Sequence, residues 1–148
     1  MTTTTPVLNP RVIALAHYAG RALLENVLAR HGLTFQQSVT LRPAALAEGP
    51  LDRDRLVAGV VGSLKIDALE AHSVVDELLA AELLAPHGPS EVRITRAGRD
   101  LHETTSAETA PITARIYAGI PEEDLAVAGR VLGLITERAD AELAALTR

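Results

Sequence analysis

The chain has 148 residues, a net charge of −5 and 47% hydrophobic residues, which is enough apolar material for one domain with a sizeable core. Aromatic residues make up only 2%, so aliphatic side chains must fill that core, which favours packed helices over a β-sandwich. The absence of cysteine excludes disulfides and thiolate metal sites. No apolar run approaches about 20 residues and no signal-peptide pattern stands at the start, so we expect a cytoplasmic protein.

The first part of the chain predicts a tail followed by one long helix. Residues 1–9 are rich in Thr and are expected to form a disordered tail. From Pro10 to His31 the apolar residues recur at helical spacing, with proline at the start and Gly32 just past the end. We therefore expect a single helix over these residues.

Two further helices are predicted before residue 65. Thr34 can cap a helix that runs through Leu46, but Pro43 would remove one of its hydrogen bonds, so we expect this helix to be distorted or broken. Asp52 is a good N-cap for the next helix, residues 53–64, whose apolar side chains face inward.

The next segment predicts a helix and a small hairpin. Asp67 is an N-cap with Glu70 three residues later, as in a capping box, and the apolar pattern continues to about Leu84. Residues 87–90, His-Gly-Pro-Ser, form a turn, and residues 91–95 alternate in polarity like a strand. A hairpin therefore follows the helix.

The C-terminal third predicts two long helices. The first runs from about Ala97 to Tyr117, with a kink expected at Pro111. The second begins at Pro121 and carries acidic residues in its first turn, which suits the helix dipole. The expected fold class is mainly α with a small β-hairpin wing: a winged helix-turn-helix flanked by N- and C-terminal helices.

Four short motifs, in order and at similar spacing, give the chain a resemblance to the MarR family of bacterial winged-helix regulators. The resemblance covers nearly everything from Pro10 onward. The motifs read Leu33-Thr34-Phe35-Gln36-Gln37, Gly49-Pro50-Leu51, Val75-Asp76-Glu77-Leu78 and Ile94-Thr95-Arg96-Ala97-Gly98. In the family the third motif lies in the helix that reads DNA, and the fourth follows the wing.

The resemblance implies a homodimer that regulates transcription by binding double-stranded DNA at a near-palindromic site, with half-sites about 34 Å apart. It implies a single domain over residues 10–148, with dimerisation helices in 10–32 and 99–148 and a winged-helix DNA-binding lobe in 33–98. A dimer would also bury the Ala-, Leu- and Val-rich helix faces at both ends, although an ordinary intramolecular core could explain them too.

Eight residues are the candidates for DNA contact. The basic ones would neutralise phosphates, and His72 and Ser73 would reach base edges. The candidates are Arg53, Arg55, Lys65, Ala68, Leu69, His72, Ser73 and Arg93. The alternatives are structural: Lys65 and Arg93 as solvated residues, and the two helix arginines paired with Asp52 and Asp54.

Two features argue against strong DNA binding. Residues 35–99 carry seven basic and nine acidic side chains, and the turn at 87–90 has no arginine at the position where the family usually inserts one into the minor groove. The first turns of the reading helix, residues 68–73, also lack arginine, lysine, asparagine and glutamine for bidentate base contacts. We therefore expect weak or shape-dependent recognition, or, alternatively, a ligand- or protein-binding module that has lost sequence-specific DNA binding.

Family members commonly respond to small aromatic ligands, and the matching positions here are His17, Tyr18, Arg21 and Arg42. At i, i+4 spacing His17 and Arg21 share one helix face and could hold an anion. The alternative is that Tyr18 is buried with its hydroxyl hydrogen-bonded, and that His17 or Arg21 belongs to the dimer interface. The five histidines show no metal-ligand spacing, and no nucleophile elbow or phosphate loop is present. No metal, cofactor or enzymatic activity is expected.

Overall fold

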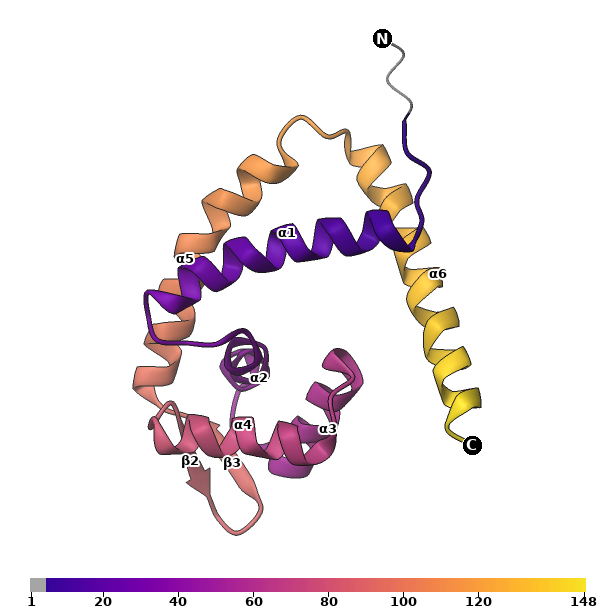
Figure 1. Ribbon diagram of the computed structural model, residues 1–148. Coiled ribbons are helices and arrows are strands. Elements are labelled where there is room, and N and C mark those ends of the chain that lie inside the picture. The colour runs from indigo at the N-terminus through magenta and orange to yellow at the C-terminus, as the bar shows by residue number, and fades with distance from the viewer. Residues whose placement is uncertain (1–4) are drawn as a thin grey trace. The chain divides into compact units, whose positions relative to one another are not determined.

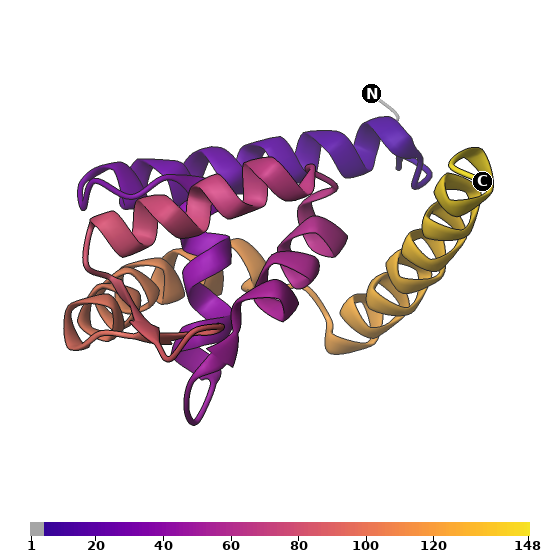
Figure 2. The ribbon, with the colours of Figure 1, turned by 90° about the horizontal axis from the view of Figure 1, so that it is seen from below.

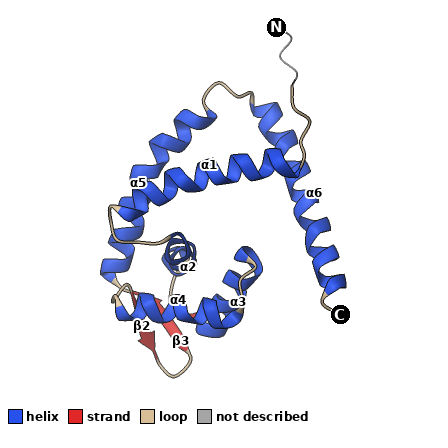
Figure 3. Ribbon diagram, viewed as in Figure 1, coloured by secondary structure: helices blue, strands red, loops and turns tan. Residues whose placement is uncertain are grey.

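The computed structural model describes residues 5–148 and is mainly helical with one small sheet, as predicted (Figure 3). The chain divides into two compact units, residues up to Ala110 and Pro111–Arg148, and each is described by itself. Residues 1–4 of the predicted tail lie outside the described residues. Residues 5–9 contain neither helix nor strand.

Helix α1 (Pro10–Ala29) begins where the sequence predicted and ends two residues early. The Asn9 side chain caps it by accepting from the Val12 amide at 2.9 Å, with proline in the first turn. Gly32, at φ +69°, then turns the chain, and the Leu33 amide donates to the Leu28 carbonyl at 3.1 Å.

Helix α2 (Phe35–Leu46) corrects one prediction, because it continues through Pro43 as a single helix. Thr34 and Gln37 form a complete capping box at its start. Pro43 stands near the C-terminal end, and the Ala47 amide still donates to the Pro43 carbonyl at 3.0 Å. Proline therefore removes one hydrogen bond from the last turns without breaking the helix.

Helices α3 (Arg53–Leu64) and α4 (Ala68–Ala80) form the predicted helix-turn-helix. The expected end of α4 near Leu84 is wrong by four residues. The chain leaves the helix through Glu82, which has φ +58°, and Leu84 instead begins a strand. In the sequence, the apolar residues of this strand continue the helical spacing of α4. The pairing of the strand in the sheet is what separates it from the helix.

The sheet has three antiparallel strands in the order β1-β3-β2. Strands β2 (Leu84–His87) and β3 (Glu91–Ile94) form the predicted hairpin. Strand β1 (Leu51–Asp52) was not predicted; Leu51 pairs with Val92 on the other edge of β3. Two residues are too few to show an alternating pattern.

The core of the first unit lies where α2 packs against α1, α3 and α4 (Figure 1 and Figure 2). Its side chains are aliphatic, as the composition required. The largest of those that are completely covered are Val27, Leu28, Leu41, Val75, Leu78 and Leu84. This core fixes α4 in place and so determines which of its side chains face outward.

Helix α5 (Arg96–Tyr117) begins beside the hairpin and runs through Pro111 as one helix. The Gly98 amide donates to Thr95 Oγ1 at 3.0 Å, and Thr95 Oγ1 donates to the Leu83 carbonyl at 3.1 Å. Gly98 is buried against that carbonyl, so a side chain has no room there. This close approach explains the glycine of the fourth motif.

The second unit contains the end of α5 and helix α6 (Glu122–Leu146). Helix α6 starts after Pro121 with three acidic residues in its first turn, as predicted. None of its residues is buried. Its exposed large apolar side chains are Val127, Leu132, Leu134, Ile135, Leu143 and Leu146.

Candidate nucleic-acid interface

Helix α4 is held at its start by a polar cap and by a contact from α2. Asp67 accepts from the Glu70 amide at 2.8 Å, which is the first half of the predicted capping box. The second half is not made, because the Glu70 carboxylate accepts from Gln36 Nε2 at 3.1 Å instead. A tertiary hydrogen bond thus takes the place of a local one.

The outward face of α4 carries small and apolar side chains near its start, together with the exposed acidic residues Glu70, Asp76 and Glu77. Ala68, Leu69 and Ser73 are exposed, and Leu69 is 81% exposed. Ala71, expected to be exposed with them, is completely buried because it lies on the inward face with Val74 and Val75.

The acidic residues of α4 are held by partners from other helices. Arg53 Nη2 donates to Asp76 Oδ1 at 2.8 Å, and Gln37 Nε2 donates to Glu77 Oε2 at 3.0 Å. Glu82, expected in the same helix, lies beyond its end. Of these three carboxylates, that of Asp76 is therefore neutralised, that of Glu77 is hydrogen-bonded and that of Glu82 lies outside the helix.

Arg53 is the most constrained of the basic candidates. Besides Asp76, it donates from Nε to His72 Nδ1 at 3.2 Å and from Nη2 to the His72 carbonyl at 3.3 Å. The alternative interpretation paired Arg53 with Asp52 or Asp54; in the structure Arg53 pairs with Asp76, and Asp52 caps α3. Arg53 and Asp76 are 23 residues apart on different helices, so no sequence pattern could have revealed their contact.

Arg55, Lys65 and Arg93 are all exposed. Arg55 borders a hollow of about 410 Å³ between the end of α2, α3 and the sheet, and no ion pair joins it to Asp52 or Asp54. Lys65 has φ +58° at the α3–α4 turn and donates to the Gly62 carbonyl at 2.7 Å. Arg55 lies on the helix before α4, Lys65 lies in the turn that leads into α4, and Arg93 lies on strand β3.

The hairpin turn between β2 and β3 is short and carries no positive charge. Gly88, at φ +64°, makes the turn, and Pro89 and Ser90 complete it. Arg93 lies two residues along β3 from the strand's first residue, paired with Ala85 on β2. The hairpin can therefore bring an arginine near a backbone phosphate from the strand and not from the tip.

The four predicted ligand-binding residues divide into a cluster and one separate side chain. Arg21 stacks 4.2 Å from the Phe35 ring centre and pairs with Glu25 at 2.7 Å. His17 lies 6.5 Å from the same ring and 6.1 Å from that of Tyr18. Tyr18 is 64% exposed, and the exposed Arg42 shows no contact with the cluster. None of the four borders either cavity described here.

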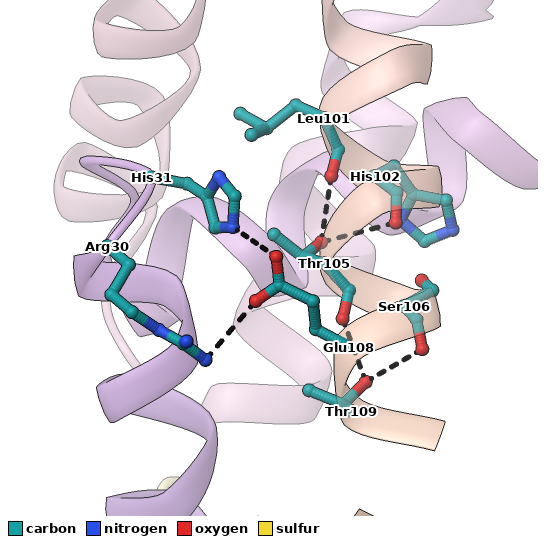
Figure 4. Close-up of polar contacts among 8 residues, drawn as sticks. All are labelled: Arg30, His31, Leu101, His102, Thr105, Ser106, Glu108 and Thr109. Carbon is teal, nitrogen blue, oxygen red and sulfur yellow. Dashed lines mark hydrogen bonds and ion pairs between the residues drawn. The ribbon is translucent and has the colours of Figure 1, made fainter. Parts of the chain in front are cut away.

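A polar cluster that the sequence did not reveal joins the end of α1 to α5. Glu108 accepts from His31 Nε2 at 2.9 Å and pairs with Arg30 at 3.2 Å (Figure 4). His31 also borders a second cavity of about 260 Å³, which is otherwise mainly apolar. These contacts span 77 residues of sequence and connect the two predicted dimerisation segments within one unit.

Residues 5–148 contain no group of three or more His, Asp or Glu side chains placed to hold a metal ion. The same residues contain no helix that is both long enough and apolar enough to cross a bilayer.

Comparisons with known proteins give structural likeness only. No protein-family model and no curated protein matches the sequence. A transcriptional regulator of the MarR family from Rhodococcus sp. RHA1 is similar in structure, with a TM-score of 0.71 and 19% identity over 84% of this chain and 91% of that one.

Two similar structures were solved as complexes. NadR bound to 4-hydroxyphenylacetate has a TM-score of 0.69 and 19% identity over 92% of this chain and 98% of that one. The MarR family protein Rv2887 of Mycobacterium tuberculosis, in complex with DNA, has a TM-score of 0.64 and 20% identity over 88% and 98%. The chain therefore has the winged-helix fold of MarR-type regulators, in agreement with the resemblance of its motifs.

Proposed function

We propose that the chain is a dimeric DNA-binding transcriptional regulator, cytoplasmic and responsive to a small ligand. The observation that carries the proposal is the outward face of α4, on which Leu69 and Ser73 are exposed. The opposite face of the helix packs into the hydrophobic core, and this packing fixes the orientation of the exposed side chains. A helix presented in this way can enter a major groove. The DNA complex of Rv2887 supports the same use of the fold.

The proposed interface contains the eight predicted residues in distinct roles. The exposed cations Arg55, Lys65 and Arg93 neutralise phosphates, and His72 and Ser73 bond to base edges. Ala68 and Leu69 make apolar contact with bases, and Arg53 supports the helix from α3. With few cations available, we expect a modest salt dependence and a large contribution from DNA shape.

The proposed dimer uses the helices at both ends of the chain, residues 10–32 and 99–148, with residues 33–98 as the DNA-binding lobe. Its support is the unburied apolar surface of α6 and of α1, where Leu15 is 52% and Leu23 44% exposed. A second copy would cover these faces and place two α4 helices about 34 Å apart, matching a near-palindromic site.

The proposed effector is a small aromatic or anionic molecule bound near His17, Tyr18, Arg21 and Arg42. The ring of Phe35 beside His17 and Arg21 adds an aromatic surface that the sequence did not indicate. The complex of NadR with 4-hydroxyphenylacetate supports this class of ligand. An anion would have to compete with Glu25 for Arg21. The function is not enzymatic and needs no cofactor.

A second candidate is a ligand- or protein-binding module without sequence-specific DNA binding. It is favoured by the uncharged hairpin tip and by the engagement of Arg53 with Asp76, which withdraws one cation from phosphate contact. The first candidate is preferred, because the same ion pair neutralises an acidic group on α4 that would repel DNA.

Binding to DNA is the decisive experiment. Fluorescence anisotropy of the purified protein with DNA from upstream of its own coding sequence, across a salt series with scrambled competitor, measures affinity and specificity together. Binding that survives competitor and weakens modestly as the salt concentration rises supports the regulator. A folded dimer that binds no duplex at low salt, with or without aromatic carboxylates, supports the module.

A further inference from the structure

We propose that Arg53 is a positioning residue that fixes the tautomer of His72, so that His72 presents a hydrogen-bond donor to a guanine edge in the major groove. The inference rests on the proposed function, and it names both the base and the mechanism of its recognition. In this account Arg53 determines sequence preference through His72 and does not itself hold a phosphate.

The direction of one hydrogen bond determines the tautomer. Arg53 Nε donates to His72 Nδ1 at 3.2 Å, and an arginine keeps all its protons in proteins, so Nδ1 must supply the lone pair. In a neutral imidazole the proton then lies on Nε2. The ring nitrogen remote from Arg53 is therefore a donor.

The Arg53 side chain is itself held in place. Its Nη2 donates to the His72 carbonyl at 3.3 Å and to Asp76 Oδ1 at 2.8 Å, so three acceptors fix one guanidinium. The side chain is only 26% exposed, whereas that of Asp76 is 67% exposed. Since the guanidinium is already engaged across one turn of α4, its geometry suits the support of His72 better than capture of a phosphate.

The donor on His72 is open to a ligand. Within residues 5–148 no protein group bonds to His72 Nε2, and this nitrogen is not among the buried polar atoms that lack a partner. Leu69, His72 and Ser73 stand at i, i+3 and i+4, so they lie on one side of α4, where Leu69 and Ser73 are exposed and His72 is half-buried. The nitrogen is therefore accessible from the proposed DNA side.

The chemistry of the base edges favours guanine, which presents two major-groove acceptors where adenine and thymine each present one. Guanine offers two major-groove acceptors, N7 and O6, and no donor, so it is the best partner for a fixed N–H group. A cytosine offers only its N4 donor in the major groove, so two hydrogen-bond donors would face each other and no hydrogen bond could form with His72. Leu69 can contact a neighbouring thymine methyl group. The proposed half-site thus contains a guanine beside a thymine.

The tautomer is tested on the free protein. Long-range ¹H–¹⁵N NMR of the His72 ring, in mildly alkaline buffer, should show one species with the proton on Nε2 and a hydrogen-bonded Nδ1. In Arg53→Met, which keeps the aliphatic stem, the Nδ1 resonance should move toward that of a solvent-exposed imidazole, and Arg53→Lys should restore part of the shift. A proton on Nδ1 in the wild-type protein would overturn the proposal.

Base recognition is tested on duplexes selected from a random pool by the wild-type protein. Replacing the contacted guanine by 7-deazaguanine should weaken wild-type binding about tenfold, have no effect on His72→Ala, and have a reduced effect on Arg53→Met. The matched control is Arg55→Met, because Arg55 is an exposed arginine on α3, the helix that also carries Arg53. This variant should lower the salt slope of binding by about one and leave base preference unchanged.

The outcomes separate the two proposals. If Arg53→Met lowers the salt slope and keeps the base preference, Arg53 is a phosphate contact and this inference is wrong while the regulator stands. If the wild-type protein selects no guanine opposite His72, the inference is also wrong. If it binds no duplex, the proposed function fails, and base recognition fails with it whatever the tautomer of His72.

Discussion

The two units of the chain differ in how they use their apolar residues. The first unit encloses a core in which Leu28, Leu78 and Leu84 are almost completely covered. In the second unit α6 has no buried residue, and Leu132, Leu134 and Ile135 are 39–40% exposed. The first unit therefore buries its apolar side chains within one chain, whereas those of α6 stay exposed, which is the reason for proposing that a second copy covers them.

The largest effect is expected from placing a charge among the exposed apolar side chains of α6. Ile135→Asp should raise the dimer dissociation constant by about 100-fold or more, because two copies each lose roughly 1.5–3 kcal/mol of apolar burial. Analytical ultracentrifugation over a dilution series measures the change. Glu137→Gln on the same helix is the control and should leave the constant unchanged; equal dissociation in both variants would show that α6 is not the interface.

The self-sufficiency of the first unit is tested in its core. Leu78→Ala should lower the free energy of unfolding by about 2–5 kcal/mol, since this completely buried leucine would leave a cavity. Urea denaturation followed by circular dichroism gives the value. The control, Leu69→Ala on the exposed side of the same helix, should change it by less than about 0.5 kcal/mol. Equal losses of stability in the two variants would mean that α4 does not turn Leu78 toward the core and Leu69 toward solvent.

The junction between the hairpin and α5 is tested at its glycine. Gly98→Ala should cost about 1–3 kcal/mol, because the added Cβ would meet the Leu83 carbonyl oxygen and lie 2.9 Å from Ile94 Cγ1. Thermal unfolding measures the loss. Gly62→Ala, where a Cβ meets nothing within 4 Å, should instead be neutral or stabilising. A stable Gly98 variant would contradict this packing.

The smallest expected effect belongs to the polar contact between α1 and α5. Glu108→Ala should lower the free energy of unfolding by about 1 kcal/mol, because the carboxylate loses His31 and Arg30 but all three side chains are partly solvated. Urea denaturation again gives the value, with Glu103→Ala on the same helix as the control. A loss above about 3 kcal/mol would show that this cluster belongs to the core.

Much of the architecture could be predicted because local signals specify it. Thr34, Asp52 and Asp67 each begin a helix through a side-chain cap, and Gly88 permits the hairpin turn. Order and spacing of these elements are properties of the sequence itself. Two errors fall where tertiary contact overrides these signals, namely the early end of α4 and the unpredicted strand β1. The third, the helix that continues through Pro43, arises because the proline stands near the end of the helix.

The candidate interface was predictable in its residue types and not in its contacts. Position along a helix-turn-helix identified His72 and Lys65, because the motif carries its own geometry. The sequence alone therefore determined most of the helices, the hairpin and which residue types stand on and beside α4. Only the tertiary structure placed Arg53 against His72 and Asp76, and His31 against Glu108. These partners are 19–77 residues apart, and such distances close only when the core forms.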